Sequence, residues 1–287
     1  MFRTLWRPVI TVSVLVATVS GFIYYFATHT AVRHQLAQTS ILTLGLLFIL
    51  YLGVVGALSL VTMATLRLCK LDLPAGESTL LTMYATVINF FGPLQSGPAF
   101  RGVYLKRKHG LNLKQYSLAT LVFYALYAAI SGVFLLSGVL GWWLLVGAVL
   151  AVGGLIFIGR SSHSLARRLQ ALQLQAIYAL ALATLLQLSL VAIIYFVELR
   201  SIDQSISIGQ AIIYAGAANF SLFVSLTPGA IGFRESFLLF SQGLHHISST
   251  TIITANIIDR AMYIVLLAVI GIVIFGTHAH RRLQPPE

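Results

Sequence analysis

Long apolar stretches separated by short polar segments make up most of the chain. Stretches long enough to cross a bilayer occupy residues 8–27, 40–66, 116–137, 142–158, 174–197 and 252–275, since a spanning helix needs about 20 apolar residues. The polar segments between them are short, and most carry Lys or Arg. The pattern predicts an all-α polytopic membrane protein with about six transmembrane helices, the first of them an extra N-terminal helix within residues 1–39.

Two further apolar segments, beginning at residues 79 and 214, are interrupted by glycines and prolines. A broken helix is tolerated inside a bilayer only where protein or water satisfies the freed backbone groups. We therefore expect each segment to form a re-entrant hairpin that enters and leaves on the same side of the membrane. The interrupting residues are Gly92, Pro93, Gly97 and Pro98 in the first segment and Pro228, Gly229 and Gly232 in the second.

The two interrupted segments resemble each other. Tyr84 and Asn89 in the first correspond to Tyr214 and Asn219 in the second, each pair being 130 residues apart. Each segment lies between two full spans, and the preceding spans run in opposite directions under this topology. These features predict one transmembrane domain, residues 1–287, that contains an inverted repeat with halves at 40–159 and 174–275.

Composition excludes a soluble protein, because hydrophobic residues make up 58% of the chain and charged residues only 9%. The net charge of +11 lies mostly beside the apolar stretches, so we interpret it as a topology signal rather than a nucleic-acid surface. With re-entrant hairpins, one face collects 14 of the 18 Lys and Arg residues, including those of the basic loop 101–115 and the basic tail 277–287. The positive-inside rule then places both termini in the cytoplasm of a cell whose cytoplasmic (inner) membrane holds the protein.

Catalytic and metal-binding signatures are missing from the sequence. It contains no GxxxxGK[ST], HExxH or GxSxG motif, so we expect neither an enzyme nor a cofactor. The adjacent histidines His245 and His246 form a polar patch near the outer interface. Because neighbouring residues do not share a helix face and no third ligand is close in sequence, we expect no metal there.

Seven polar residues are expected near the centre of the protein. One interpretation is a stabilising network in which Arg234 pairs with Asp259 and Glu235 with Arg260. The other is that Arg234 and the N-terminus of a half-helix starting near Ile231 together bind a phosphate. The two asparagines either cap freed backbone groups or contact the ligand. The candidate substrate-binding residues are Asn89, Arg101, Asn219, Arg234, Glu235, Asp259 and Arg260.

The turn at residues 228–235, which reads PGAIGFRE, resembles the lysylphosphatidylglycerol synthase transmembrane-region family. The stretch 97–105 and the pair Asp259-Arg260 are similar to further elements of that family, so the resemblance covers roughly residues 40–275. Ala230 stands where the family usually has a second glycine, and Pro98 stands where a glutamate often provides an acidic partner for Arg101. No synthase domain follows, so lipid aminoacylation is not implied.

What the resemblance implies is flippase-like translocation, or binding, of a membrane phospholipid or an isoprenoid-linked lipid, without ATP. Its anionic headgroup would be held by intramembrane arginines. Two alternatives stay open. One is a secondary transporter of a small anion or amphiphile, coupled to protons through Glu235 or Asp259. The other is a non-transporting partner of a separate lipid-modifying enzyme.

Overall fold

The structure is a computed structural model, and it describes residues 39–91, 96–141, 174–222 and 232–283 together with the single positions 30, 143 and 230. Every regular element in this part of the chain is a helix. Four of the helices are long and apolar enough to span a membrane, namely α3 (Ile41–Leu68), α6 (Leu113–Leu140), α9 (Leu174–Ile202) and α13 (Ser249–Leu283). The other two predicted spans, 8–27 and 142–158, lie outside the described residues.

Each interrupted segment consists of two helices that pack against each other. The first hairpin comprises α4 (Ala75–Phe91) and α5 (Gly97–His109). The second hairpin comprises α10 (Ile208–Ser221) and α11 (Phe233–Phe240), and the short α12 (Gln242–His245) follows it. Gly97 and Pro98 begin α5, where the absent N–H of a proline costs no helical hydrogen bond. The remaining predicted interruptions, at 92–93 and 228–229, fall on residues that the structure does not describe.

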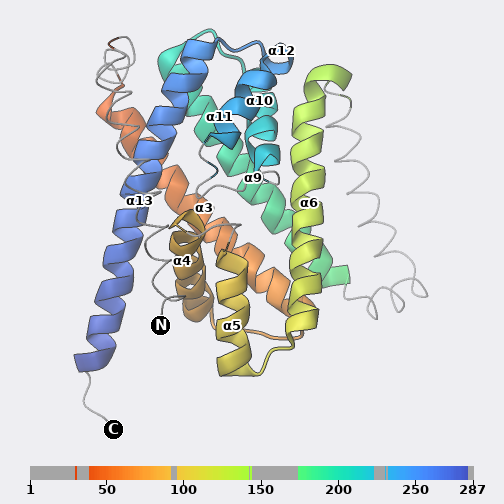
Figure 1. Ribbon diagram of the computed structural model, residues 1–287, viewed down its shortest axis with the longest axis vertical. Coiled ribbons are helices and arrows are strands. Elements are labelled where there is room, and N and C mark those ends of the chain that lie inside the picture. The colour runs from red at the N-terminus through yellow and green to blue at the C-terminus, as the bar shows by residue number, and fades with distance from the viewer. Residues whose placement is uncertain are drawn as a thin grey trace, which may run out of the picture.

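The long helices α3 and α9 lie side by side through the centre of the protein and pack extensively on each other (Figure 1). The first hairpin lies in the lower half of Figure 1, and α10, α11 and α12 lie in the upper half. Helix α6 covers α10, and α13 covers α4, so each of these long helices packs on the hairpin of the other half. Many apolar side chains on the outer surface are exposed, as expected for helices that face lipid.

Glycine allows two of these contacts to be unusually close. A Cβ atom at Gly216 of α10 would lie 2.3 Å from the backbone nitrogen of Leu135 in α6. A Cβ atom at Gly97 of α5 would lie 2.7 Å from the carbonyl oxygen of Ala85 in α4. Both contacts are with backbone atoms, so only glycine fits at either position.

Two expectations from the sequence are corrected by the fold. The basic residues of the expected loop 101–115 lie largely in α5, which continues to His109 and ends at Gly110 with a φ of 66°. His245 is fully buried rather than part of an exposed polar patch. The Ile247 N–H donates to Nδ1 of His245 at 3.2 Å, so the Nε2 proton is directed to the Leu238 carbonyl oxygen at 3.1 Å.

Candidate functional site

A cavity of about 280 Å³ lies between the two halves and is lined by side chains from both hairpins and all four long helices. This volume is close to the lower end of the range for ligand pockets, about 300–1,000 Å³. Six of the seven candidate residues line it, and Glu235 does not. The structure therefore brings these residues together; their contact with a substrate stays a prediction. The six are Asn89, Arg101, Asn219, Arg234, Asp259 and Arg260.

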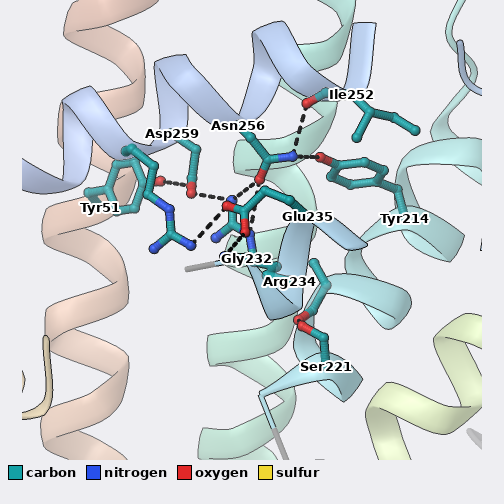
Figure 2. A network of polar contacts seen from close by, with 11 residues as sticks. Tyr51, Tyr214, Ser221, Gly232, Arg234, Glu235, Ile252, Asn256 and Asp259 are labelled. Atoms are coloured by element: carbon teal, nitrogen blue, oxygen red, sulfur yellow. Dashed lines mark hydrogen bonds and ion pairs between the residues drawn. The ribbon is translucent and has the colours of Figure 1, made fainter. Parts of the chain in front are cut away.

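Arg234, at the start of α11, is held by two residues of α13 (Figure 2). Its Nε and Nη2 atoms donate to Oδ1 of Asn256 at 3.1 and 2.6 Å, and Nη2 also donates to Oδ2 of Asp259. The guanidinium group also lies 5.6 Å from the ring centroid of Tyr195. Arg234 is buried and its charge is compensated, so the first of the two expected ion pairs is confirmed.

Tyrosines of α3 and α10 form hydrogen bonds with the two α13 residues that contact Arg234. The Tyr51 hydroxyl of α3 donates to Oδ1 of Asp259, and Nδ2 of Asn256 donates to the Tyr214 hydroxyl of α10 at 3.2 Å. We call Tyr51, Tyr214, Arg234, Asn256 and Asp259 the Arg234 cluster. The sequence offered one signal for Asn256, because it precedes Asp259 by three positions and therefore shares its helix face. It offered none for Tyr51, which lies 208 residues from its partner.

Glu235 connects the second expected pair to the start of α11. Its Oε1 accepts from Nη2 of Arg260 at 3.1 Å, and its Oε2 accepts from the backbone N–H of Gly232 at 2.8 Å. The pair Glu235–Arg260 is therefore confirmed as well. The N-terminal end of α11, expected from the sequence to bind phosphate together with Arg234, is already bound by this carboxylate, and Arg234 is bound by α13.

Arg101 of α5 has different surroundings. Its Nη1 donates to the Thr62 hydroxyl of α3 at 2.6 Å, while its buried Nε has no hydrogen-bond partner. Among the residues that the structure describes, no carboxylate lies within ion-pair distance of Arg101. The positive charge of this half-buried side chain is therefore uncompensated in the cavity wall.

The two asparagines also differ. Asn89 accepts a hydrogen bond from the backbone N–H of Gly97 at 3.2 Å, so its oxygen caps the start of α5. Asn219, which is buried, accepts from the Tyr127 hydroxyl at 2.9 Å and leaves its Nδ2 atom without a partner. The buried Gln187 of α9 similarly has an unpartnered Oε1 in the cavity wall.

One buried carboxyl group near the Arg234 cluster was not singled out by the sequence pattern. Glu198 of α9 is completely buried, and neither of its carboxyl oxygens has a hydrogen-bond partner among the described residues. It lies within electrostatic range of Arg234 and Asp259 but does not line the cavity. It directly follows the predicted span 174–197, and its burial near residues of α3, α10 and α13 depends on packing that the span pattern does not contain.

A family model described as the lysylphosphatidylglycerol synthase TM region matches residues 9–271. The chain belongs to this family. No curated protein and no solved structure matches it. The match confirms the resemblance drawn from the 228–235 turn, and it includes every residue that lines the cavity. As a member of the lysylphosphatidylglycerol synthase TM region family, with four described helices apolar enough to span a bilayer, the protein is a membrane protein.

Ala230, within the stretch 228–235 that carries the family resemblance, has an unusual backbone conformation. Its φ is 57°, in the left-handed region that glycine adopts at much lower cost. This agrees with the resemblance, in which a second glycine usually stands at this position. Ala230 also lines the cavity, so the departure from the family pattern adds one methyl group to its wall.

Proposed function

We propose that this member of the family binds an anionic lipid within the membrane and moves it between leaflets without ATP and without catalysing a reaction. The observation that carries the proposal is one cavity into which both hairpins and α13 bring arginine. Three guanidinium groups line it, and only two of them have a carboxylate partner among the described residues. The guanidinium group without a carboxylate partner favours an anionic ligand.

The cost of lipid translocation explains why such a cavity is useful. A lipid crosses easily with its acyl chains in hydrocarbon, whereas a bare phosphate taken out of water loses many kcal/mol of solvation. A guanidinium group matches the geometry of phosphate and remains charged in an apolar environment. A cavity at the centre of the protein that contains arginine therefore lowers the barrier for the headgroup.

The arrangement of helices supports alternating access as the mechanism. If α3, α4, α5 and α6 are exchanged for α9, α10, α11 and α13, the packed helix pairs map onto one another: α3–α4 onto α9–α10, α6–α10 onto α13–α4, and α3–α6 onto α9–α13. This correspondence of contacts supports the proposal of an inverted repeat, in which rocking of one half against the other exposes a central site to each leaflet in turn.

The membrane face from which each hairpin can be labelled tests the proposed inverted repeat. We propose that the first hairpin enters from the cytoplasmic side of the inner membrane, where most Lys and Arg residues lie, and the second from the opposite side. Gly76 and Gly243 have open space around them, so cysteine is tolerated at both. A membrane-impermeant maleimide should label Gly76→Cys only from the cytoplasmic face and Gly243→Cys only from the other. Labelling of both from one face would contradict the inverted repeat.

The translocation proposal is tested in proteoliposomes that contain a fluorescent phosphatidylglycerol, with chemical quenching of the outer leaflet. The full chain should accelerate exchange between leaflets relative to protein-free vesicles. Leu58 lines the cavity, whereas Leu60 on the same helix is exposed on the outside. Leu58→Trp should therefore abolish most of the exchange and Leu60→Trp should not. Equal exchange by the two variants, or none by the wild type, would refute transport through this cavity.

Glu198 favours a second candidate function, a secondary transporter that couples anion movement to protons. Glu235 and Asp259, the carboxylates first considered for this role, are both ion-paired, whereas Glu198 is buried without a partner for either oxygen. Intramembrane acids of this kind serve as proton relays in transporters. In that case transport would respond to an imposed pH gradient, and Glu198→Gln would remove the response while leaving exchange without a gradient intact.

A further inference from the structure

We infer that the anion-binding position in the cavity is formed by Arg101 and Asn219, one residue from each half, and that it selects a phosphodiester with a single negative charge. This inference rests on the proposed function, because it names the substrate class of the same cavity. It also separates the three arginines into one that binds the ligand and two that hold the structure.

The hydrogen-bond inventory distinguishes the arginines. Arg234 directs Nε and Nη2 to Asn256 and Asp259, and its carboxylate partner compensates its charge. Arg260 is paired with Glu235. A ligand phosphate would have to displace a carboxylate from either of them. At Arg101 it would displace no carboxylate of the described residues, among which the side chain donates only to a threonine hydroxyl.

Asn219 supplies a second donor from the opposite half. The Tyr127 hydroxyl donates to its Oδ1 atom, and its NH₂ group has no partner among the described residues. The side chain is 3% exposed, and a buried donor left unsatisfied is costly. An oxyanion bound between Arg101 and Asn219 would satisfy both this donor and the Nε of Arg101.

The charge of the lining selects the ligand. Two of the three guanidinium groups, those of Arg234 and Arg260, are paired with carboxylates, and Arg101 has no carboxylate partner among the described residues. A phosphodiester whose headgroup carries no cation has one negative charge and compensates that of Arg101, whereas a phosphomonoester carries about 1.5–2 at pH 7 and leaves an excess of negative charge in an apolar site. Aromatic side chains form much of the remaining wall, among them Phe90, Phe123, Tyr124, Tyr195 and Tyr263.

A binding experiment on the purified full chain in nanodiscs tests the inference without requiring transport. The probes are phosphatidylglycerol, phosphatidic acid and phosphatidylcholine, with soluble glycerophosphoglycerol and inorganic phosphate as lipid-free competitors. Retention of lipid is counted by native mass spectrometry, and affinity is measured by competition. We expect phosphatidylglycerol to bind at least tenfold more tightly than either other lipid. Competition by glycerophosphoglycerol but not by phosphate would assign the selectivity to the diester itself, and competition by neither would assign it to the lipid.

Substitutions of Arg101 and Asn219 test whether these two residues bind the ligand. Arg101→Gln should weaken phosphatidylglycerol binding about 10- to 100-fold, the range for a hydrogen bond to a charged group, and Arg101→Lys should restore part of it. Arg107→Gln is the matched control, because Arg107 lies exposed on the same helix. Asn219→Asp keeps the acceptor for Tyr127 but replaces the donor by an anion, so it should weaken binding at least as much.

The outcomes separate this inference from the proposed function. Full affinity in Arg101→Gln or Asn219→Asp, or tighter binding of phosphatidic acid than of phosphatidylglycerol, would overturn the inference even if the wild type moves lipid. Selective binding that depends on Arg101 would support it even if reconstituted protein moves no lipid, in which case the translocation proposal alone would fail.

Discussion

Arg101 and Arg234 follow related sequences in the two hairpins, yet their surroundings are opposite. Each comes after a Tyr-Ala-x-x-x-Asn-Phe stretch and a helix break. Arg234 contacts an aspartate and an asparagine of α13, whereas Arg101 contacts a threonine of α3. Counted from the first residue of each helix, Phe123 in α6 and Asp259 in α13 are both the eleventh residue. The first half therefore has a phenylalanine where the second has the acidic partner.

We propose that the two similar hairpins serve different purposes. A buried ion pair contributes little net stability but strongly disfavours any arrangement that separates it, because one charge is then left alone. The Arg234 cluster thus fixes the position of α11 on α13. The first hairpin has no such pair at its arginine, and its charge is available to a ligand.

The largest expected effect comes from removing the acidic partner of Arg234. Asp259→Asn gives Arg234 surroundings like those of Arg101, but in a more buried position. An uncompensated buried charge should lower the free energy of unfolding by about 3–5 kcal/mol. Denaturant titration of the purified protein in detergent measures this. Arg67→Gln is the control, because Arg67 pairs with Asp72 on an exposed surface, with side chains 59% and 85% exposed. Such pairs contribute about 0–1 kcal/mol, and equal stability of the two variants would remove the difference between the arginines.

Close packing between the halves gives the next largest effect. In Gly216→Ala the new methyl group would overlap the backbone of Leu135, which cannot move without shifting α6. We expect a loss of about 1–3 kcal/mol, the usual cost of overpacking. Gly132→Ala on α6 is the matched control, since a Cβ atom there meets nothing within 4 Å. A stable Gly216→Ala variant would mean that α10 can shift away from α6, so that the two halves are not held together by this contact.

The sequence predicted most of the framework because bilayer-spanning helices leave a one-dimensional signal. Apolar length predicted α3, α6, α9 and α13, and the glycines and prolines predicted that each interrupted segment divides into two helices. Of the two interpretations of the central polar residues, the pairing of Arg234 with Asp259 and of Glu235 with Arg260 is confirmed. What the sequence did not show was the direction of each side chain around its helix, because the apolar surroundings are nearly uniform.

Tyr51 and Glu198 show this limit. Tyr51 lies in an apolar stretch and Glu198 directly follows one, and neither pattern distinguishes the face toward lipid from the face toward protein. Their surroundings depend on how α3 packs on α9, which no local pattern specifies. The same reason explains why Arg101 and Arg234 looked equivalent in the sequence: the residue that separates them, Phe123 or Asp259, lies on another helix.

Removing the uncompensated charge should have a small effect of the opposite sign. Arg101→Met keeps the length of the side chain and removes a guanidinium group with no carboxylate partner among the described residues. We expect the free energy of unfolding to rise by up to about 1 kcal/mol, as is common when a functional residue is replaced. The hydroxyl of Thr62 keeps its bonds to Leu58 and Thr82. Arg234→Met should instead destabilise the protein, so parallel unfolding curves of the two variants decide whether binding and structural arginines differ.

The smallest expected effect concerns the outer ends of the hairpins. Glu77, the third residue of α4, accepts hydrogen bonds from Tyr104, Lys108 and His109 of α5, whereas Gln210, the third residue of α10, forms a neutral capping box with Ser207. Burial alone would raise the pKa of Glu77, but these hydrogen bonds outweigh it and lower the pKa to about 2.

A lowered pKa in the folded state stabilises the protein above the unfolded value of about 4.3, and that contribution is lost as the pH falls from there toward 2. Between pH 5 and pH 3 the wild type should therefore lose up to about 1 kcal/mol of stability that Glu77→Gln never has. Gln210→Ala should lower stability equally at both pH values, because its capping box contains no titratable group. A wild type and a Glu77→Gln variant with parallel pH profiles would show that the ends of the two hairpins do not differ in this respect.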